Sequence, residues 1–348
     1  MISVLQPPAL QKMDAGPDAW AHALNGNFRN SCKRWLSAAD MPDLPERVAV
    51  GWSGGADSTA LLLALKCSGR DVMAWHVDHG WRDNSAREAA QLAEQAAAWG
   101  VAFVSARLSA GVHASEAQAR AGRYEQFQSW SRQFHLTTLC LGHHRDDQAE
   151  TVCMRLLQGA GAAGCRGMWR ERQIGALRVV RPLLHLPSKT MRQAMSLAGI
   201  DWLEDSTNRD MRIWRNRIRH RLFPAMAKAG IAPDALFLRW QRQAESVTLR
   251  LDAAAELLMQ QLSRTETGLC LPWALWVNSV PPTRARWLQK CMAQLLGDGV
   301  TPGRRHLIMV EAWTRKSGRG GLDLSRCRLY RERDYLHLRP ATSAFGRH

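Results

Sequence analysis

Short apolar segments alternate with longer helical patterns between residues 48 and 141. Four apolar segments have the length and composition of buried strands: Val48–Trp52, Val72–Val77, Val101–Val104 and Thr137–Leu141. Helical patterns fill the intervals, over about Asp57–Cys67, Ser85–Trp99 and Ser115–Phe134. Strands that alternate with helices are typical of a parallel sheet covered on both faces. The pattern therefore predicts an α/β fold with a parallel, Rossmann-like sheet.

The chain on either side of this region has a different pattern. The residues from about Ala19 to Ala38 predict a helix in an N-terminal lead-in. The segment Pro233–Leu262 predicts one long helix, and strand-like segments follow at Leu322–Leu324 and Tyr335–Leu338. We therefore predict two domains. The larger covers residues 1–225, and the smaller, largely helical one covers residues 226–348 with a linker helix at about 233–262.

The charge of the chain indicates an anionic partner. Its 348 residues include 47 Lys and Arg against 31 Asp and Glu, a formal net charge of +16. Such an excess favours nucleic acid over a membrane surface, and no apolar run approaches the ~18 residues of a membrane span. Residues 226–348 hold 19 basic and 10 acidic residues, net +9, against 28 and 21, net +7, in residues 1–225. The smaller part is more basic per residue, so we expect it to bind RNA.

The eight cysteines exclude several kinds of site. No two of them form a C-x-x-C pair, so a zinc ribbon, a thioredoxin-type pair and a cysteine-ligated iron–sulfur cluster are unsupported. Free thiols suit a reducing compartment. We therefore expect a cytoplasmic protein with no membrane association.

A glycine-rich turn directly follows the first predicted strand. It consists of Ser53, Gly54, Gly55, Ala56, Asp57 and Ser58. Glycines let the backbone approach an anion closely, and the free N–H groups in the first turn of the next helix point at it. The serine hydroxyls add donors, and Asp57 adds a carboxylate that would hold Mg²⁺ against phosphates. The alternative is an ordinary polar turn with a helix cap, since the pattern is neither G-x-x-x-x-G-K-[ST] nor G-x-G-x-x-G.

A second polar cluster follows the fourth predicted strand. His143 lies at the strand end, and Asp146, Asp147 and Glu150 enter the next helix, where carboxylates are favoured. Asp147 and Glu150 are three residues apart and share a helix face. Such carboxylates beside a phosphate loop would bind Mg²⁺ or orient an attacking amine; the alternative is a well-capped helix with solvated acids. Ligands of parallel sheets bind beyond the carboxyl ends of the strands, so we expect this cluster and the loop to share one crevice.

Arginines are concentrated further along the chain, between residues 209 and 221. They are Arg209, Arg212, Arg215, Arg217, Arg219 and Arg221. A solvated basic helix face is the simpler interpretation of such a run. Contact with phosphate groups or with an RNA backbone is the functional one.

Several blocks resemble known families. The turn at 53–58 resembles the S-G-G-x-D-S loop of the PP-loop ATP pyrophosphatases, and the segment from His143 to Thr151 resembles the H-H-x-D-D-Q-A-E-T block of the tRNA(Ile)-lysidine synthases. Further blocks of that family resemble residues 76–82 (HVDHGWR), 116–124 (EAQAR and RY), 181–184 (RPLL), 202–208 (WLEDSTN) and 215–220 (RNRIRH). The resemblance covers about residues 47–224.

The resemblance implies a carbon–nitrogen ligase that uses ATP and Mg²⁺. In this family ATP adenylates O2 of cytidine 34 in a tRNA(Ile) with a CAU anticodon and releases pyrophosphate. The ε-amine of free L-lysine then attacks C2 and displaces AMP, which leaves lysidine. The implied partners are therefore this tRNA and lysine, and a homodimer stays an open alternative to a monomer.

The matched positions suggest roles for individual residues. The expected catalytic residues are Asp57, His143, Asp147, Glu150 and Arg217. Asp57 and Asp147 would ligate Mg²⁺, while Glu150 or His143 would orient or deprotonate the lysine amine, because an ammonium cannot attack. The residues expected to bind substrate or tRNA are Arg120, Arg123, Asp205, Asn208, Arg209 and Arg217.

Two other functions compete with this interpretation. A different PP-loop enzyme, such as a tRNA 2-thiocytidine synthetase or a glutamine-dependent amide synthetase, would require cysteine pairs or a glutaminase domain. A catalytically inactive RNA-binding protein would show a damaged loop or acid cluster, and both are intact in the sequence. The chain departs from the family pattern at Trp81, Gln158, Cys165 and Lys189, none of which removes an obvious catalytic group.

Overall fold

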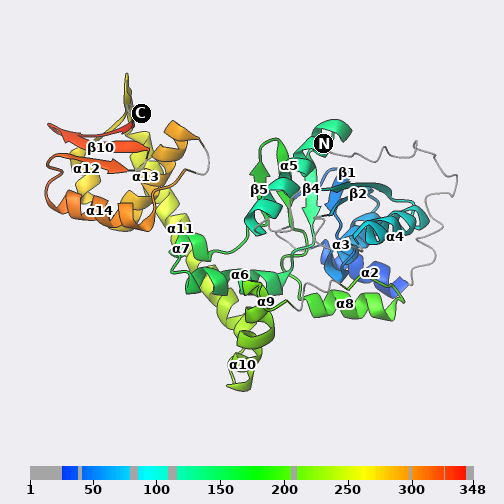
Figure 1. Cartoon of the computed structure of the whole chain (residues 1–348). Helices are drawn as coiled ribbons and strands as arrows, with labels where there is room; N and C mark the ends of the chain where they lie inside the picture. Colours follow the sequence, from blue (N-terminus) through cyan, green and yellow to red (C-terminus); the bar gives the residue numbers. More distant parts are fainter. Residues whose placement is uncertain are drawn as a thin grey trace. The chain divides into compact units, whose positions relative to one another are not determined.

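The computed structural model describes residues 26–37, 41–78, 85–108, 116–204, 210–297, 300–324 and 326–341. The chain divides into two compact units, residues 1–241 and 242–348 (Figure 1). This boundary falls inside helix α11 (Pro233–Gln260), which corresponds to the predicted long helix. The assignment of residues 1–225 to catalysis and of 226–348 to tRNA binding stays a prediction.

A six-stranded sheet forms the centre of the first unit, in the order β3-β2-β1-β4-β6-β5. Its strands are β1 (Arg47–Gly51), β2 (Asp71–Asp78), β3 (Ala102–Arg107), β4 (Thr138–Leu141), β5 (Glu171–Ile174) and β6 (Leu177–Val180). Every pairing is parallel except that of β5 with β6. The first four strands are the four predicted ones, so the predicted α/β class with a largely parallel sheet is confirmed.

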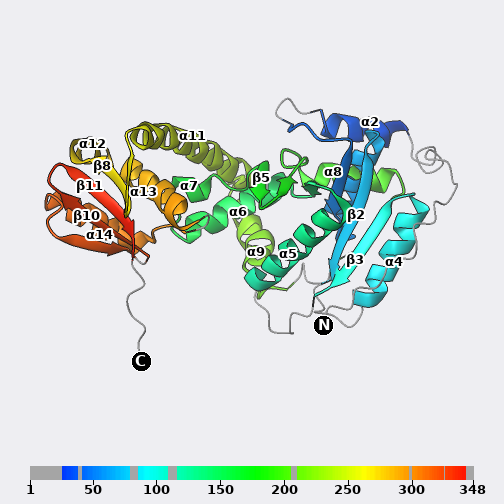
Figure 2. The ribbon, with the colours of Figure 1, turned by 90° about the horizontal axis from the view of Figure 1, so that it is seen from above.

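Helices cover both faces of this sheet (Figure 2). They include α2 (Gly26–Trp35), α3 (Ala56–Cys67), α4 (Ser85–Ala98), α5 (Glu116–Phe134) and α8 (Ser188–Leu197). Alternate residues of β1 belong to different cores: Val48 and Val50 pack with α3, whereas Ala49 packs with the aromatic residues of α5. Apolar residues on both faces of a strand produce the continuous apolar runs seen in the sequence. The predicted helices are confirmed within the described residues; residues 19–25, Ala38 and Ser115 lie outside them.

The strand order reverses between β1 and β4. From β1 the chain continues to β2 and β3 on one side, and from β4 it continues to β6 on the other. In open α/β sheets, ligands bind beyond the carboxyl ends of the strands at such a switch point. The segments that leave β1 and β4 here are the glycine-rich turn and the acidic cluster.

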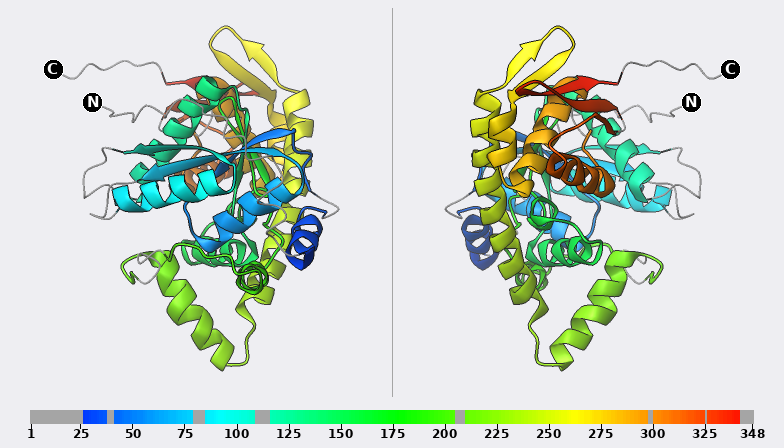
Figure 3. Two further views of the ribbon diagram at one scale, coloured as in Figure 1. Left: turned by 90° about the vertical axis from the view of Figure 1, so that its right-hand side faces the viewer. Right: turned by 90° about the vertical axis from the view of Figure 1, so that its left-hand side faces the viewer.

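Further elements complete the first unit. Helices α6 (Arg145–Leu157) and α7 (Ala162–Cys165) follow β4, and α9 (Trp214–Arg217), a π-helical turn at Ile218–Leu222 and α10 (Phe223–Lys228) precede α11. Figure 3 shows α10 and the start of α11 as the two arms of a helical hairpin, in which Phe223 stacks on Phe237 with ring centroids 5.5 Å apart.

The second unit contains a five-stranded antiparallel sheet packed against helices. Its strand order is β7-β8-β11-β10-β9, and β7 and β8 form the yellow hairpin in Figure 3. The elements are β7 (Ser263–Thr265), β8 (Gly268–Pro272), α12 (Trp273–Asn278), α13 (Pro281–Leu296), α14 (Arg304–Arg315), β9 (Gly321–Leu324), β10 (Cys327–Glu332) and β11 (Tyr335–Pro340). The predicted strands are confirmed as parts of β9 and β11. Trp276 and Trp287 lie fully buried in the core of this unit.

All eight cysteines are free thiols, and all but Cys67 are buried. Among the described residues, no helix has the length and apolar character needed to cross a membrane.

Candidate active site

A cavity of about 1070 Å³ opens beyond the carboxyl ends of β1 and β4. Its lining includes the turn after β1, the cluster after β4 and the first turns of α8. Small-ligand pockets usually measure about 300–1,000 Å³, so this cavity is large enough for a nucleotide and part of a second substrate. The expectation that the two polar clusters share one crevice is confirmed.

The turn after β1 leaves a helix N-terminus open to the cavity. Gly55 precedes α3, and no side chain caps the helix. Ser53 and Ser58 organise the turn instead: their hydroxyls lie 3.1 Å apart, and the Ser58 hydroxyl donates to the carbonyl of Gly55 at 3.0 Å. The N–H groups in the first turn of α3 are therefore available to an anion, as the sequence predicted.

Gly54 gives the turn its shape. Its φ of +81° lies in the left-handed region, which disfavours residues with a Cβ. A Cβ here would also lie 2.8 Å from side-chain atoms of Leu203 and Leu92, and the Gly54 carbonyl accepts a hydrogen bond from the Leu203 N–H at 2.9 Å. The turn is thus fixed against the segment that enters the cavity from residues 202–204.

Replacement of Gly54 by alanine is expected to lower the free energy of unfolding of the first unit by about 1–2 kcal/mol, the cost of a left-handed conformation for an L-residue. Gly55→Ala is the matched control, because Gly55 has a φ of −70° and the nearest atom to its Cβ would be 3.5 Å away. Hydrogen exchange of amides in β1 and α3 measures both variants. Equal losses for the two would contradict this account of the turn.

Gly142 brings the two clusters together. A Cβ on this residue would lie 2.8 Å from the carbonyl oxygen of Asp57 and 2.9 Å from the backbone nitrogen of Ser58. The backbone at the end of β4 therefore runs directly against the start of α3. Any larger residue at this position would force the turn and the acidic cluster apart.

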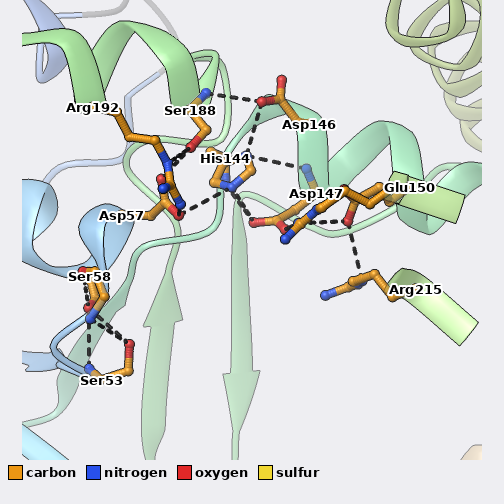
Figure 4. A network of polar contacts seen from close by, with 12 residues as sticks. Ser53, Asp57, Ser58, His144, Asp146, Asp147, Glu150, Ser188, Arg192 and Arg215 are labelled. Atoms are coloured by element: carbon orange, nitrogen blue, oxygen red, sulfur yellow. Dashed lines mark hydrogen bonds and ion pairs between the residues drawn. The ribbon is translucent and has the colours of Figure 1, made fainter. Parts of the chain in front are cut away.

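His144 links the two clusters chemically (Figure 4). It caps α6 in a reciprocal arrangement. Its ring Nδ1 accepts a hydrogen bond from the backbone N–H of Asp147 at 3.3 Å, and the backbone N–H of His144 donates to Asp147 Oδ2 at 3.1 Å. Because Nδ1 is an acceptor, Nε2 carries the proton. Nε2 lies 3.5 Å from Asp57 Oδ2 and 3.3 Å from Asp147 Oδ2, so both carboxylates converge on it.

The charges in this group keep the carboxylate of Asp57 ionised. Burial alone would raise its pKa, but hydrogen bonds from His144 and Ser188 and the charge of Arg192 outweigh burial and lower the pKa to about 2. For His144, burial lowers the pKa, while the hydrogen bond to Asp57 and the charges of Asp57, Asp146 and Asp147 raise it above the ordinary value for histidine.

The first turns of α8 contact Asp57 and Asp146. The Ser188 hydroxyl donates to Asp57 Oδ1 at 2.6 Å, its N–H donates to Asp146 Oδ2 at 3.1 Å, and Arg192 lies 3.5 Å from Asp57 Oδ2. Lys189 also lines the cavity. This helix therefore contributes two cations and a hydroxyl beside the anion-binding turn.

Glu150 lines the cavity and is one of the most deeply buried charged groups among the described residues of the first unit, with 2% of its surface exposed. Arg219 makes two hydrogen bonds to it, at 2.6 and 3.0 Å, and a third to Asp147 at 3.3 Å. Arg215 lies 3.6 Å from the same carboxylate. Burial raises the pKa of Glu150, and the hydrogen bond and charge of Arg219 oppose that shift.

His143 lines the cavity with one ring nitrogen already occupied. Its Nδ1 accepts a hydrogen bond from the guanidinium of Arg181 at 3.2 Å. Burial lowers the pKa of His143 to about 3, and the charge of Asp147 only partly opposes that effect. The imidazole is therefore neutral with its proton on Nε2, which makes it a hydrogen-bond donor to the cavity.

The arginines predicted to act at the site have different positions. Arg123 lines the cavity, whereas Arg120 lies over the ring of Tyr124, 5.1 Å from its centroid, outside the lining. Arg217 is exposed and donates to the backbone carbonyls of Met211 and Arg212, at 2.7 and 3.3 Å. The predicted residues Asp205, Asn208 and Arg209 lie outside the described residues.

The arginine that reaches the acidic cluster is Arg219 rather than Arg217. Residues two apart on a helix point in nearly opposite directions, whereas residues four apart share a face. Arg215 and Arg219 are four apart, and both contact Glu150. That spacing was visible in the sequence and identifies the pair. Ser188 and Arg192 were also missed, and no spacing in the sequence relates them to Asp57.

The donor set around Asp57 fits magnesium bound together with phosphate. Among the described residues, no group of three or more His, Cys, Asp or Glu side chains is arranged to hold a metal ion. Mg²⁺, however, is commonly held by one or two carboxylates together with substrate phosphates and water. Asp57 Oδ2 and Asp147 Oδ2, which converge on His144, supply two such oxygens beside the open N-terminus of α3.

The sequence matches a known class of ATP-binding domain. The switch-point cavity and its turn are those of a PP-loop protein, and a family model described as a PP-loop domain matches residues 27–226.

Similar proteins of known name indicate a particular family within this class. The chain is 40% identical over 185 residues to a tRNA(Ile)-lysidine synthase of Chlamydia pneumoniae, 52% of this chain and 58% of that protein. It is 32% identical over 233 residues to the tRNA(Ile)-lysidine synthase of Chlamydia felis, and this match covers 66% of this chain and 74% of that protein. It is 34% identical over 281 residues to the tRNA(Ile)-lysidine synthase of Salinispora tropica, and this match covers 78% of this chain and 84% of that protein. The chain belongs to the tRNA(Ile)-lysidine synthase family.

Proposed function

We propose that the protein ligates lysine to C2 of cytidine 34 in the CAU anticodon of tRNA(Ile), in a reaction that converts ATP to AMP and pyrophosphate. The observation that carries this proposal is that an open helix N-terminus and a carboxylate cluster line the same cavity and meet through His144. An anion site for the triphosphate therefore lies beside groups suited to a cation and an amine. The family relationship supports the same reaction.

The first step is adenylation of the cytidine. O2 of the base attacks the α-phosphorus of ATP, a new P–O bond forms, and the bond to the pyrophosphate breaks. The first turn of α3 and the cations Lys189 and Arg192 of α8 line the cavity, and they would stabilise the negative charge that develops on the phosphates. Asp57 and Asp147 would hold Mg²⁺, which supplies charge neutralisation to the phosphates when it is bound.

The second step joins lysine to the base. The amine nitrogen forms a bond to C2, and the bond between C2 and the oxygen that carries AMP breaks. The amine must be neutral to attack, so a base must accept its proton. Glu150 suits this role because burial raises its pKa. His143 suits a positioning role, because Arg181 already occupies its Nδ1 and its Nε2–H can donate to the substrate.

The proposal assigns tRNA binding to the basic surfaces of both units. Four arginines would contact phosphates: Arg120, Arg123, Arg209 and Arg217. Asp205 and Asn208 would recognise lysine or cytosine. Residues 226–348, with a net charge of +9, would add affinity without sequence discrimination. Such an enzyme would act in the cytoplasm.

Pyrophosphate release tests the adenylation step. The protein is incubated with ATP, Mg²⁺ and a tRNA(Ile) transcript with the CAU anticodon, and pyrophosphate is measured with each component omitted in turn. We expect release to require both ATP and the tRNA. Release that depends on sulfide or glutamine would indicate a different PP-loop reaction, and no release would favour an RNA-binding protein.

A further inference from the structure

Trp169 has an unusually exposed position beside the site. Its indole is 45% exposed, although tryptophan is among the largest apolar side chains and is usually well buried. One of its faces is covered by the guanidinium of Arg166, which lies 3.3 Å from the ring centroid. An exposed aromatic ring beside a cation is the combination with which proteins stack single-stranded nucleobases.

The backbone that carries Trp169 is held firmly. The side-chain amide of Gln148 pairs with Met168 in both directions: Nε2 donates to the Met168 carbonyl at 2.9 Å, and Oε1 accepts from its N–H at 2.6 Å. Arg181 donates to the Trp169 carbonyl at 2.7 Å. At Gly167, with a φ of +77°, a Cβ would lie only 2.5 Å from Gln148 Oε1, so the segment packs tightly on α6. A ring on such a rigid support loses little freedom when a ligand binds.

The two residues that hold this segment also belong to the surroundings of the cavity. Gln148 lies on α6 between Asp147 and Glu150. Arg181 bridges Trp169 to His143, because one of its nitrogens donates to the Trp169 carbonyl and another to His143 Nδ1. Trp169 is thus two hydrogen bonds away from a residue that lines the cavity. If the target base of an RNA strand enters this cavity, the bases next to it would come within reach of this segment.

We propose that Trp169, backed by Arg166, is a stacking platform for a nucleobase adjacent to the modified cytidine; this inference rests on the proposed function. The indole would take the base on the face opposite Arg166, and the guanidinium would add positive charge near the phosphates. Stacking needs no particular base edge, so the platform would position the anticodon loop rather than read its sequence. The adenine that follows the cytidine in CAU offers the larger ring surface of the two neighbours.

Binding of a fluorescently labelled CAU anticodon stem–loop to the full chain tests the platform. Trp169→Ala is expected to weaken binding roughly 5- to 150-fold, the range that loss of one stacked base covers. Trp169→Phe keeps an aromatic face and should stay within about threefold of the wild type. The matched control is Trp240→Ala, because Trp240 is similarly exposed, at 48%, and lies on α11 rather than on the segment that Gln148 and Arg181 hold.

A base-specific readout complements the affinities. With 2-aminopurine in place of the adenine after the target cytidine, fluorescence should fall when the wild-type protein or Trp169→Phe binds, because the base stacks on the ring. The fall should be absent with Trp169→Ala at saturating protein. Quenching that is the same for Trp169→Ala and the wild type would contradict the platform.

The outcomes separate the platform from the proposed function. If the wild type binds and modifies the RNA but Trp169→Ala binds it as tightly, the platform is wrong and the proposed function stands. Equal weakening by Trp169→Ala and Trp240→Ala would also overturn the platform, because the effect would then be general to exposed tryptophans. If the wild type neither binds nor modifies the RNA, the proposed function fails and the platform fails with it.

Discussion

Replacement of Asp57 by asparagine is expected to lower the rate of tRNA-dependent pyrophosphate release by roughly 100-fold or more. Asparagine has the same shape but no charge, so it can accept the hydrogen bond from Ser188 yet cannot balance the charge of Arg192 and of a bound cation. The carboxylate is also the proposed ligand of Mg²⁺ closest to the open N-terminus of α3. Single-turnover release of pyrophosphate measures the effect directly.

The matched control for this variant is Asp71→Asn. Asp71 lies at the start of β2, pairs with Arg47 at the surface and is 59% exposed, so its loss should leave the rate within about twofold. Because the pKa of Asp57 is about 2, this carboxylate stays ionised at every pH used for assay. A loss of activity at low pH is therefore expected to come from the protonation of a different group. Near-normal release by Asp57→Asn would remove this carboxylate from the reaction.

Replacement of Arg219 by alanine is expected to destabilise the first unit by about 3 kcal/mol, because Glu150 would be left buried with much of its charge uncompensated. Glu150 has only 2% of its surface exposed and receives two of its hydrogen bonds from Arg219. Arg215, 3.6 Å away, compensates only in part. Native-state hydrogen exchange of β4 and α6 amides reports on this unit alone and should become roughly 100-fold faster.

Arg217→Ala and a double variant are the controls for this prediction. Arg217 is exposed, donates to two backbone carbonyls and lies over the ring of Trp214, 5.5 Å from its centroid, so its loss should cost less than about 1 kcal/mol. Glu150→Gln combined with Arg219→Ala removes the buried charge and should recover part of the stability that Arg219→Ala loses. The account of this ion pair is wrong if Arg217→Ala is the more damaging change, or if the double variant recovers nothing.

The sequence predicts the central sheet well because its strands are buried on both faces. Continuous apolar runs such as Val48–Val50 leave little choice of structure, and the glycine-rich turn and acidic cluster follow them directly. The β5–β6 hairpin was missed because the residues of β5 are largely exposed and carry no apolar pattern. In the second unit, short strands such as β7 give equally little signal.

The site is predicted in part, for a physical reason. Residues that act next to their own strand, such as Asp57 and Asp147, can be identified from local sequence, because the sheet fixes where strand ends lie. Ser188 and Arg192 reach Asp57 from a helix more than 130 residues later, through packing that no local pattern records. Arg219 was obscured by its neighbour Arg217, although its four-residue spacing from Arg215 indicates the face that meets Glu150.

Transfer of labelled lysine to RNA tests the central claim most directly. The wild-type protein is incubated with ATP, Mg²⁺, labelled L-lysine and a CAU-anticodon tRNA(Ile) transcript, and the label retained on the RNA is counted, with a tRNA(Met) transcript and the Asp57→Asn variant in parallel. We predict label on tRNA(Ile) that requires ATP, is absent from tRNA(Met) and is lost in the variant. Pyrophosphate release without label on the RNA would contradict lysine as the nucleophile, and label that persists in Asp57→Asn would contradict the proposed site.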